Sequence, residues 1–303
     1  KAGKTEGWHD AAFYNMCRPL ELVFSNGWDK GEKISIETGA VEDMATFEEF
    51  YDAYKKQMDY QISLLVNADN AIDQAHMERC PLPFESCMVD DCMARGMSLQ
   101  EGGAIYNFTG PQGFGIANVA DSLYAIKKLV FDEHKATLGD FKRALALNYG
   151  KGFDEITVAE MTAQIVQELK QAGRSVSDED IAVIAKTIMD TKLSDADQAM
   201  CDNLYDMIDD LPKFGNDIGD VDALARDAAY TYTKPVEKYK NPRGGMFQAG
   251  VYPVSANVPL GGQTGATPDG RLAHRPVADG VSPSSGKDVH GPTAAANSVA
   301  KLD

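Results

Sequence analysis

The sequence predicts an α/β fold in which helices predominate. From Thr46 to Leu65, apolar residues recur three and four positions apart, which is the spacing of a long helix with one buried face. The segment VYPVSANVP (251–259) alternates as a strand does, inside a stretch (241–303) that holds ten glycines and seven prolines. With 303 residues, of which 44% are hydrophobic, the chain can build one large α/β unit or two domains.

Each predicted helix has its own sequence signal. Residues 10–25 (DAAFYNMCRPLELVFS) carry a helical pattern, in which Pro19 is expected to introduce a kink or a break. Thr46 and Glu49 form a capping box at the start of the long helix. The acidic helix starts and amphipathic patterns of residues 151–211 predict a peripheral helical insertion. Further helices are expected over residues 85–96, ending at Gly96, from Val119 to Phe131, over 155–173, and over 177–191 with Ser177 as its N-cap.

Composition and charge narrow the function classes. With 46 acidic and 29 basic residues, the formal charge is −17, which disfavours nucleic acid and membranes as partners. No apolar run is long enough to cross a bilayer, and the first residues do not form a signal peptide. The five cysteines lack a CxxC pair and are expected to be reduced thiols in the cytoplasm. Neither their spacing nor the GPQGFG loop (110–115) favours a metal or nucleotide site.

Residue patterns alone leave the chemistry open between an enzyme and a binding module, because no hydrolase or metalloenzyme template is present. Longer stretches carry a resemblance to a known family, the glycyl radical enzymes. It covers nearly the whole chain except the insertion at 151–211, and GWHDAAF is similar to the dehydratases of glycerol and 1,2-propanediol. The stretches are GKTEGWHDAAF, PLPFESCMVDDC, EGGAIYNFTGPQGFGIANVADSLYAIKKLVF, PKFGNDI, NPRGGMFQAGVYPVSANVP and GATPDGRLAHRPVADGVSPSSGKDVHGPTAAANSVAKLD.

The resemblance implies part of a ten-stranded barrel made of two half-barrels surrounded by helices. Residues 1–150 would form its first part, 151–211 the insertion, and 212–303 the second part with Gly/Pro-rich loops. The chain is expected to be an internal piece of a longer protein, because the family's Cys-x-Glu loop and glycyl radical loop are not in it. We therefore expect no activity from this piece alone, and Cys17 is expected to be buried packing rather than the catalytic cysteine.

The resemblance also implies site residues. In the diol dehydratases the Asp of the WHD motif contacts substrate hydroxyls, so Asp10 would hydrogen-bond the departing hydroxyl and help deliver a proton. His9 is the second catalytic candidate, as a partner of Asp10. The alternative for Asp10 is a structural role as a helix N-cap. Substrate-binding positions are one residue on the predicted helix face of Asp10 and three on one face of the predicted strand: Phe13, Tyr252, Val254 and Ala256.

The implied reaction is the radical elimination of water from a small vicinal diol to give an aldehyde. A thiyl radical on the missing cysteine would remove hydrogen from the hydroxyl-bearing carbon, and the missing Glu would deprotonate that hydroxyl. No cofactor is expected to bind this piece. The protein glycyl radical would be installed by an activating enzyme that uses S-adenosylmethionine, under anaerobic conditions. The whole enzyme is expected to be a cytoplasmic homodimer, with a bacterial microcompartment as an alternative location.

Three alternatives stay open. Within the family they are isethionate sulfite-lyase and hydroxyproline dehydratase. The face of the predicted strand that carries Tyr252 has no Arg or Lys, which suits a neutral diol better than a sulfonate. The third alternative is a non-catalytic structural fragment that only packs against another chain.

Overall fold

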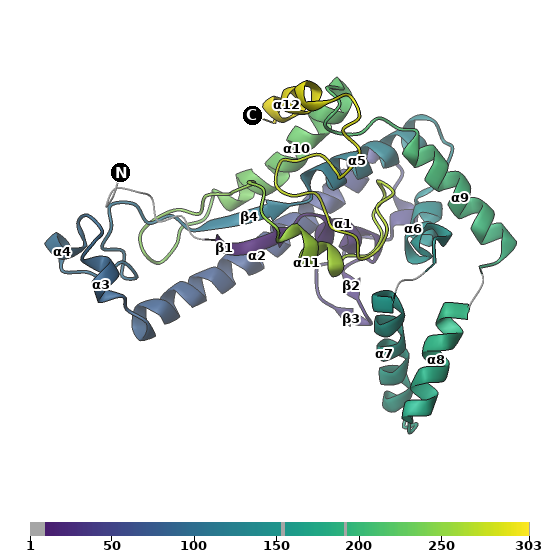
Figure 1. The fold of residues 1–303 in the computed structure, drawn as a ribbon, viewed down its shortest axis with the longest axis horizontal. Coiled ribbons are helices and arrows are strands. Elements are labelled where there is room, and N and C mark those ends of the chain that lie inside the picture. The colour runs from purple at the N-terminus through teal and green to yellow at the C-terminus, as the bar shows by residue number, and fades with distance from the viewer. Residues whose placement is uncertain (1–9, 153–154, 191–192, 303) are drawn as a thin grey trace.

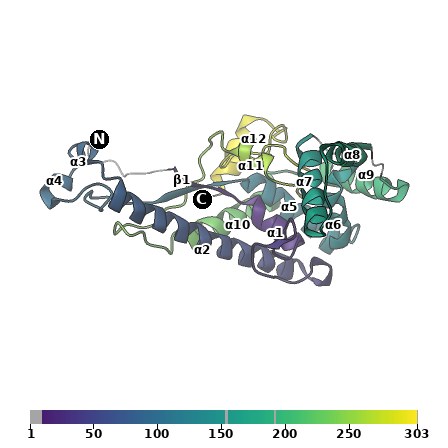
Figure 2. The same ribbon diagram turned by 90° about the horizontal axis from the view of Figure 1, so that it is seen from below.

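The computed structural model describes residues 10–152, 155–190 and 193–302, and it confirms a helix-rich α/β fold (Figure 1). A small parallel sheet runs alongside the long helix α2, and most other helices gather around one end of α2 (Figures 1 and 2). In chain order the elements are β1 (Asp10–Asn15), α1 (Cys17–Phe24), β2 (Trp28–Asp29), β3 (Glu32–Lys33), η1 (Val41–Asp43), α2 (Phe47–Arg79), α3 (Pro83–Ser86), α4 (Cys92–Arg95), β4 (Gly110–Phe114), α5 (Ile116–Ile126), η2 (Lys127–Asp132), α6 (Leu138–Ala146), η3 (Asn148–Gly150), α7 (Glu155–Gln171), α8 (Asp178–Asp190), α9 (Asp195–Asp209), α10 (Gly219–Val236), α11 (Asn257–Gly262) and α12 (Pro292–Ala300).

The central sheet consists of β1 and β4, which pair in parallel. Asp10 lies opposite Gly110 at its amino end, and the register shifts once within β1. A parallel bridge joins Gln112 of β4 to Gly250. Because β1 occupies one edge of β4, the segment around Gly250 occupies the other, so β4 lies between them.

The predicted helix over residues 10–25 is wrong in its first half, because residues 10–15 form β1 instead. Their burial alternates as in a strand: Phe13 is 44% exposed, whereas Tyr14 is buried. Helix α1 begins only at Cys17. Pro19 therefore lies in its first turn, where a missing N–H loses no intrahelical bond, and it neither kinks nor breaks the helix.

The predicted strand over 251–259 is also wrong. Residues 251–256 form no strand, and α11 begins at Asn257. The bridge to β4 ends at Gly250. Pro253, three residues later, has no N–H with which to continue a ladder. The burial of the side chains still alternates along this segment: Tyr252 is half-buried, whereas Pro253 and Ser255 are exposed.

Other predictions that rest on short sequence patterns agree better with the structure. The capping box of α2 is confirmed: Thr46 Oγ1 accepts from the N–H of Glu49, and the Glu49 carboxylate accepts from the N–H of Thr46. Residues 85–96 do not form one helix: α3 ends at Ser86, and α4 begins at Cys92 after Asp91, whose φ is +76°. Gly96 ends α4 in the left-handed region, as its position predicted.

Helix α5 follows β4 after a single residue and forms the centre of the hydrophobic core. Nearly every residue of α5 is buried, and the helix packs against α1 and α10. The connection requires a glycine: Gly115 has φ +90°, and a Cβ there would lie 2.8 Å from Cys17 Sγ. Cys17 itself is buried packing, as predicted.

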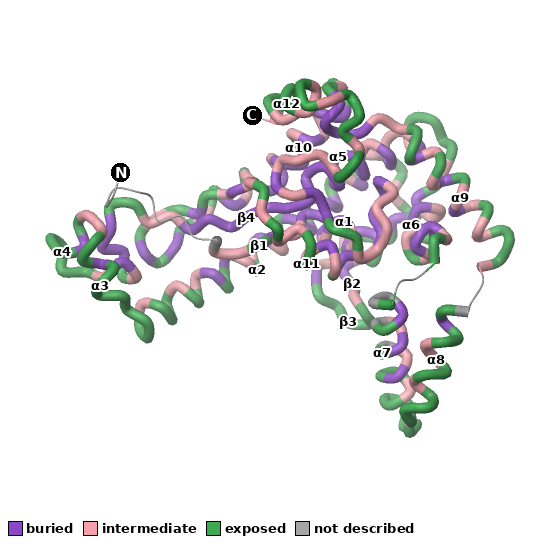
Figure 3. Tube along the Cα trace, viewed as in Figure 1, coloured by how far each residue is buried: buried purple, intermediate pink, exposed green. Residues whose placement is uncertain are grey.

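Helices α7 and α8 are confirmed, and they pack on each other as a hairpin that projects from the body of the molecule (Figure 1). Ser177 Oγ accepts from the N–H of Asp180, which confirms this N-cap. Helix α9 behaves differently, because it packs against α6, and Cys201, Leu204 and Ile208 join the main core (Figure 3). The peripheral role predicted for residues 151–211 stays a prediction. The exposed α7–α8 hairpin agrees with it, whereas the partly buried α9 does not.

Candidate functional site

The first candidate region is the amino end of β1, where sequence analysis places the catalytic residues. His9 lies outside the described residues, and of Asp10 the structure describes the backbone. That backbone begins β1 opposite Gly110. The N-cap of α1 is Met16, which makes no side-chain capping bond. Asp10 is therefore not the N-cap of α1, and its structural alternative is wrong.

The four predicted substrate-binding residues lie on the two sides of β4. Phe13 belongs to β1, and its ring meets Phe114 edge to face with 5.8 Å between centroids. The other three follow the bridge at Gly250 on the opposite edge of β4 and are half-buried: Tyr252, Val254 and Ala256. Because β1 is a strand, Phe13 and Asp10 do not share the helical face that was predicted for them. Tyr252, Val254 and Ala256 likewise do not share a strand face, because residues 251–256 form no strand.

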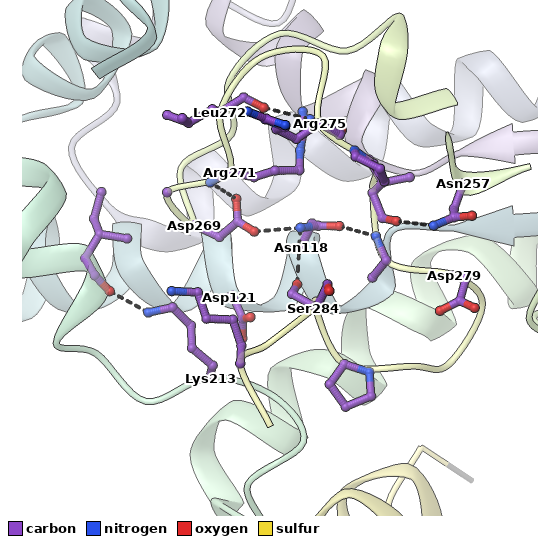
Figure 4. A pocket seen from close by; sticks show the side chains of 18 of the residues that line it. Asn118, Asp121, Lys213, Asn257, Asp269, Arg271, Leu272, Arg275, Asp279 and Ser284 are labelled. Carbon is purple, nitrogen blue, oxygen red and sulfur yellow. Dashed lines mark hydrogen bonds between the residues drawn. The ribbon is translucent and has the colours of Figure 1, made fainter. Parts of the chain in front are cut away.

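The second candidate region is a cavity of about 540 Å³ that sequence analysis did not predict (Figure 4). It is bounded by α5, by the end of α9 with Lys213 after it, by the start of α11, and by the loop segments between residues 269 and 287. Eight charged residues line it, four of each sign: Asp121, Asp209, Asp269, Asp279, Lys213, Arg271, Arg275 and Lys287. Since β4 leads directly into α5, this cavity lies beyond the carboxyl end of the sheet. Asp10 lies at the other end of β1, roughly 16 Å of strand away.

Asp121 is the most unusual group in this cavity. Its side chain is buried, with 2% of the residue exposed; Oδ1 accepts the N–H of Phe214 at 2.7 Å, and Oδ2 has no partner. Burial raises the pKa of Asp121 well above its usual range, and the nearby Asp269 raises it further. The carboxyl group is therefore favoured in its neutral form, which can donate one hydrogen bond as well as accept.

Other polar groups tie α5 to the loop that covers it. Asn118 Nδ2 donates to Asp269 Oδ2 at 2.7 Å and to Ser284 Oγ at 3.2 Å, as Figure 4 shows. Lys213 Nζ donates to the carbonyl oxygens of Ile208 and Leu211. Burial lowers the pKa of Lys213, and the carboxyl groups of Asp121 and Asp269 oppose that shift. The network holds the loop in place and leaves only Asp121 with an unused side-chain oxygen among these residues.

A sequence signal for this cavity existed. Asn118, Asp121 and Ser122 are buried polar residues inside α5, a helix whose other residues are mostly apolar, and such polar residues need buried partners. The partner of Asn118 is Asp269, 151 positions later, in the stretch GATPDGR, and the partner of Asp121 is the N–H of Phe214. Sequence alone does not say that these two stretches meet.

Metal and membrane chemistry can be addressed for the described part of the chain. There, no group of three or more His, Cys, Asp or Glu side chains is placed to hold a metal ion. Cys87 is exposed and Cys92 is buried. No described helix combines the length and apolar character required to span a membrane.

Comparison with known proteins shows what the chain as a whole is similar to. A family model described as pyruvate formate lyase-like matches residues 1–261. A solved structure concerned with 1,2-propanediol dehydration in Roseburia inulinivorans shares 64% identity and a TM-score of 0.92, over 99% of this chain and 36% of that chain. The glycerol-bound B12-independent glycerol dehydratase from Clostridium butyricum shares 47% identity and a TM-score of 0.80, over 99% of this chain and 32% of that one.

Among curated proteins, the (2S)-3-sulfopropanediol dehydratase of Klebsiella oxytoca is 32% identical over 310 residues, covering 100% of this chain and 32% of that protein. The chain therefore spans about a third of the length of the relatives it matches.

Proposed function

This chain belongs to the pyruvate formate lyase-like family, and from that premise we propose that it is part of a glycyl radical diol dehydratase. The proposed reaction removes water from 1,2-propanediol or glycerol and yields an aldehyde. One observation carries the proposal: over 99% of its length the chain is 64% identical in sequence to the protein in a structure concerned with 1,2-propanediol dehydration. Identity falls to 47% with the glycerol dehydratase and to 32% with the sulfopropanediol dehydratase.

The radical chemistry would be supplied by a protein glycyl radical and a cysteine–glutamate loop that we place outside residues 1–303. Cys17 does not fit the role of the radical-relaying cysteine, because its side chain is fully buried in the hydrophobic core, with Sγ against the carbonyl of Gly115. We further propose that an S-adenosylmethionine-dependent enzyme activates the full-length protein, which would be an anaerobic, cytoplasmic homodimer.

In this proposal Asp10 assists the departing hydroxyl by hydrogen bonding and proton delivery, with His9 as its partner. The exclusion of Asp10 as the N-cap of α1 supports a role in the site. Phe13 would form apolar wall on β1, and the half-buried residues Tyr252, Val254 and Ala256 would form wall on the far side of β4.

A neutral substrate is favoured over a sulfonate by the composition of that second wall. Residues 248–262 contain neither Lys nor Arg. A sulfonate held in a closed site calls for cationic donors, whereas diol hydroxyls can be held by carboxyl and amide groups. Kinetic comparison of 1,2-propanediol, glycerol and 3-sulfopropanediol in the full-length enzyme would test this preference.

The replacement Asp10→Asn in the full-length enzyme tests the catalytic assignment. Asn keeps the size of the side chain but cannot deliver a proton, so turnover of 1,2-propanediol should fall by about 10² or more. The glycyl radical should still form, which electron paramagnetic resonance would measure in the same sample. Asp52→Asn, at an exposed carboxylate paired with Lys55, is the matched control and should leave both readouts unchanged. Near-normal turnover with a normal radical signal would exclude Asp10 as the acid.

A further inference from the structure

Gln112, in the middle of β4, is a buried polar residue to which neither candidate region gives a role. It is completely buried, and it is the register partner of Phe13 on β1. Register partners on neighbouring strands lie on the same face of a sheet. The other face carries Tyr14, which stacks on Tyr232 of α10, and Gly113, which lies against the same ring. Gln112 and Phe13 therefore face away from α10.

The amide group of Gln112 is fixed in one orientation. Nε2 donates to the carbonyl oxygen of Gly110 at 3.1 Å. Because a carbonyl oxygen can only accept, the NH2 end of the amide must face Gly110, and Oε1 is its other end. The amide also lies over Gly250, on the far edge of β4, where a Cβ would come within 2.1 Å of Oε1. A glycine at position 250 is therefore what leaves room for this side chain.

The oxygen of this amide lacks a partner. Within the described part of the chain, Oε1 is buried and makes no hydrogen bond. Leaving a buried amide oxygen unpaired is costly, so native proteins keep such an atom for a reason. Because the atom is enclosed, its partner must come from a neighbouring segment rather than from the surface. The amide is tied to Gly110, and the residue paired with Gly110 on the neighbouring strand is Asp10.

An extra residue in β1 gives Asp10 and Phe13 the same relation to β4. From Asp10 to Phe13 there are three steps along β1, whereas their partners Gly110 and Gln112 are two steps apart on β4. In a regular strand, residues three apart face opposite sides of the sheet. The extra residue therefore gives Asp10 a register position on the face of Gln112, and bulges of this kind re-aim side chains beside active sites. Neighbouring strands lie about 4.8 Å apart, which an aspartic acid side chain can span.

An amide oxygen distinguishes the two forms of a carboxyl group. It accepts hydrogen bonds and cannot donate them, so it bonds to a carboxylic acid and not to a carboxylate. A hydrogen bond made by the neutral form favours that form. In the proposed reaction Asp10 must hold a proton in order to deliver it to the departing hydroxyl.

The acidic groups of α2 at this end of the sheet belong to the other face. Asp69 interacts electrostatically with Tyr232, and Asp73 forms an ion pair with Arg243 at 3.0 Å. Arg243 also donates to Thr109 Oγ1, and Thr109 alternates onto the face that carries Gly113. These groups therefore lie across the sheet from Gln112. His9, the proposed partner of Asp10, lies outside the described residues.

We propose that Gln112 is a positioning residue for the acid of the dehydration, because its Oε1 accepts a hydrogen bond from the protonated carboxyl group of Asp10. The inference rests on the proposed function, in which Asp10 is that acid. The hydrogen bond holds the carboxyl group against β4 and retains its proton until the hydroxyl departs. The contact involves β1, β4 and the segment at Gly250, which all belong to this chain.

Infrared difference spectroscopy of the full-length protein tests this contact without turnover. Subtracting the spectrum of the matching Asp10→Asn protein isolates the carboxylic acid band of Asp10, and its loss with rising pH gives the pKa. Gln112→Met keeps the length of the side chain but removes the acceptor. The pKa of Asp10 should then fall by about one pH unit, a tenfold change in the ratio of acid to carboxylate. The alkaline limb of the pH profile of kcat should move down equally, because the acid acts only when protonated.

Gln57→Met is the matched control. Gln57 is also completely buried, and its amide bonds to Ser35 and Ile36 beside α2. Its replacement should lower the melting temperature but leave the pKa of Asp10 and the pH profile unchanged. Gln112→Glu is a second variant that keeps the shape of the side chain and adds a negative charge, so it should raise the pKa of Asp10. A merely structural role of Gln112 does not shift this pKa in opposite directions in its two variants.

An unchanged pKa of Asp10 in Gln112→Met would overturn the proposal, as would equal shifts in Gln112→Met and Gln57→Met. The outcome is separable from that of the proposed function. If the pKa falls in Gln112→Met while Asp10→Asn turns over normally, the hydrogen bond stands and the acid role of Asp10 is wrong. If Asp10→Asn loses turnover with a normal radical signal and the pKa does not move in Gln112→Met, the acid role stands and the hydrogen bond is wrong.

Discussion

Helix α5 and the α7–α8 hairpin both show helical patterns in the sequence, yet their environments in the structure are opposite. Helix α5 is covered on nearly all sides and linked through Asn118 and Asp121 to distant loops. The hairpin leaves large apolar residues exposed, among them Val183 at 60% and Met189 at 63%. The contrast teaches that the spacing of apolar residues is enough to predict a helix. How many of its faces are covered by neighbours depends on which residues, polar or apolar, lie around its whole circumference.

The largest effect is expected where β4 enters α5. Phe114→Ala removes a completely buried ring and should lower the local free energy of unfolding by about 3–5 kcal/mol. Its neighbour Phe13 is 44% exposed, so Phe13→Ala should cost only about 1 kcal/mol. Native-state hydrogen exchange at the amides of β4 and α5 would measure both. An equal loss of unfolding free energy in the two variants would show that the buried Phe114 ring contributes no more to stability than the half-exposed Phe13 ring.

An intermediate effect is expected at Asp121 and depends on pH. Because burial raises its folded-state pKa above the unfolded value, the folded protein retains a proton that the unfolded chain releases. Wild-type stability should therefore fall as pH rises through the interval between these two pKa values, by up to about 1.4 kcal/mol per pH unit.

Asp121→Asn removes this dependence while keeping an oxygen for the N–H of Phe214. The difference between the thermal midpoints of variant and wild type should shift in favour of the variant from pH 4 to pH 8. A difference that is constant over this range would contradict a raised pKa in the folded state.

The smallest effect is expected from removal of the hairpin. Replacing residues 155–190 by a short linker in the full-length enzyme should leave the ranking of diol substrates unchanged, because α7 packs on α8 rather than on either candidate site. A deletion extended through Asp209 is the informative contrast. It also removes α9, whose Cys201, Leu204 and Ile208 are in the core, and should destabilise the fold. A changed substrate ranking in the shorter deletion would place the hairpin near the substrate.

Features determined by neighbouring residues could be predicted, and those determined by distant ones could not. The capping box at Thr46 and Glu49 involves residues three positions apart, and it was predicted correctly. Residues 10–15 become a strand only because β4 pairs with them, and no local pattern records that partner. The cavity arises in the same way, from contacts between α5 and a loop about 150 residues later. Asp10 itself was found through family resemblance, since no residue pattern distinguished it.

The pairing of Asp10 with Gly110 also has a consequence for the order in which the protein takes shape during synthesis. A ribosome adds about 5–20 residues per second, so β1 leaves it roughly 5–20 s before the strand it needs. In that interval α2, which requires no distant partner for its own hydrogen bonds, can already form, whereas β1 presents unpaired backbone groups to other nascent chains. Chaperone demand during translation should therefore be concentrated between the emergence of β1 and that of β4.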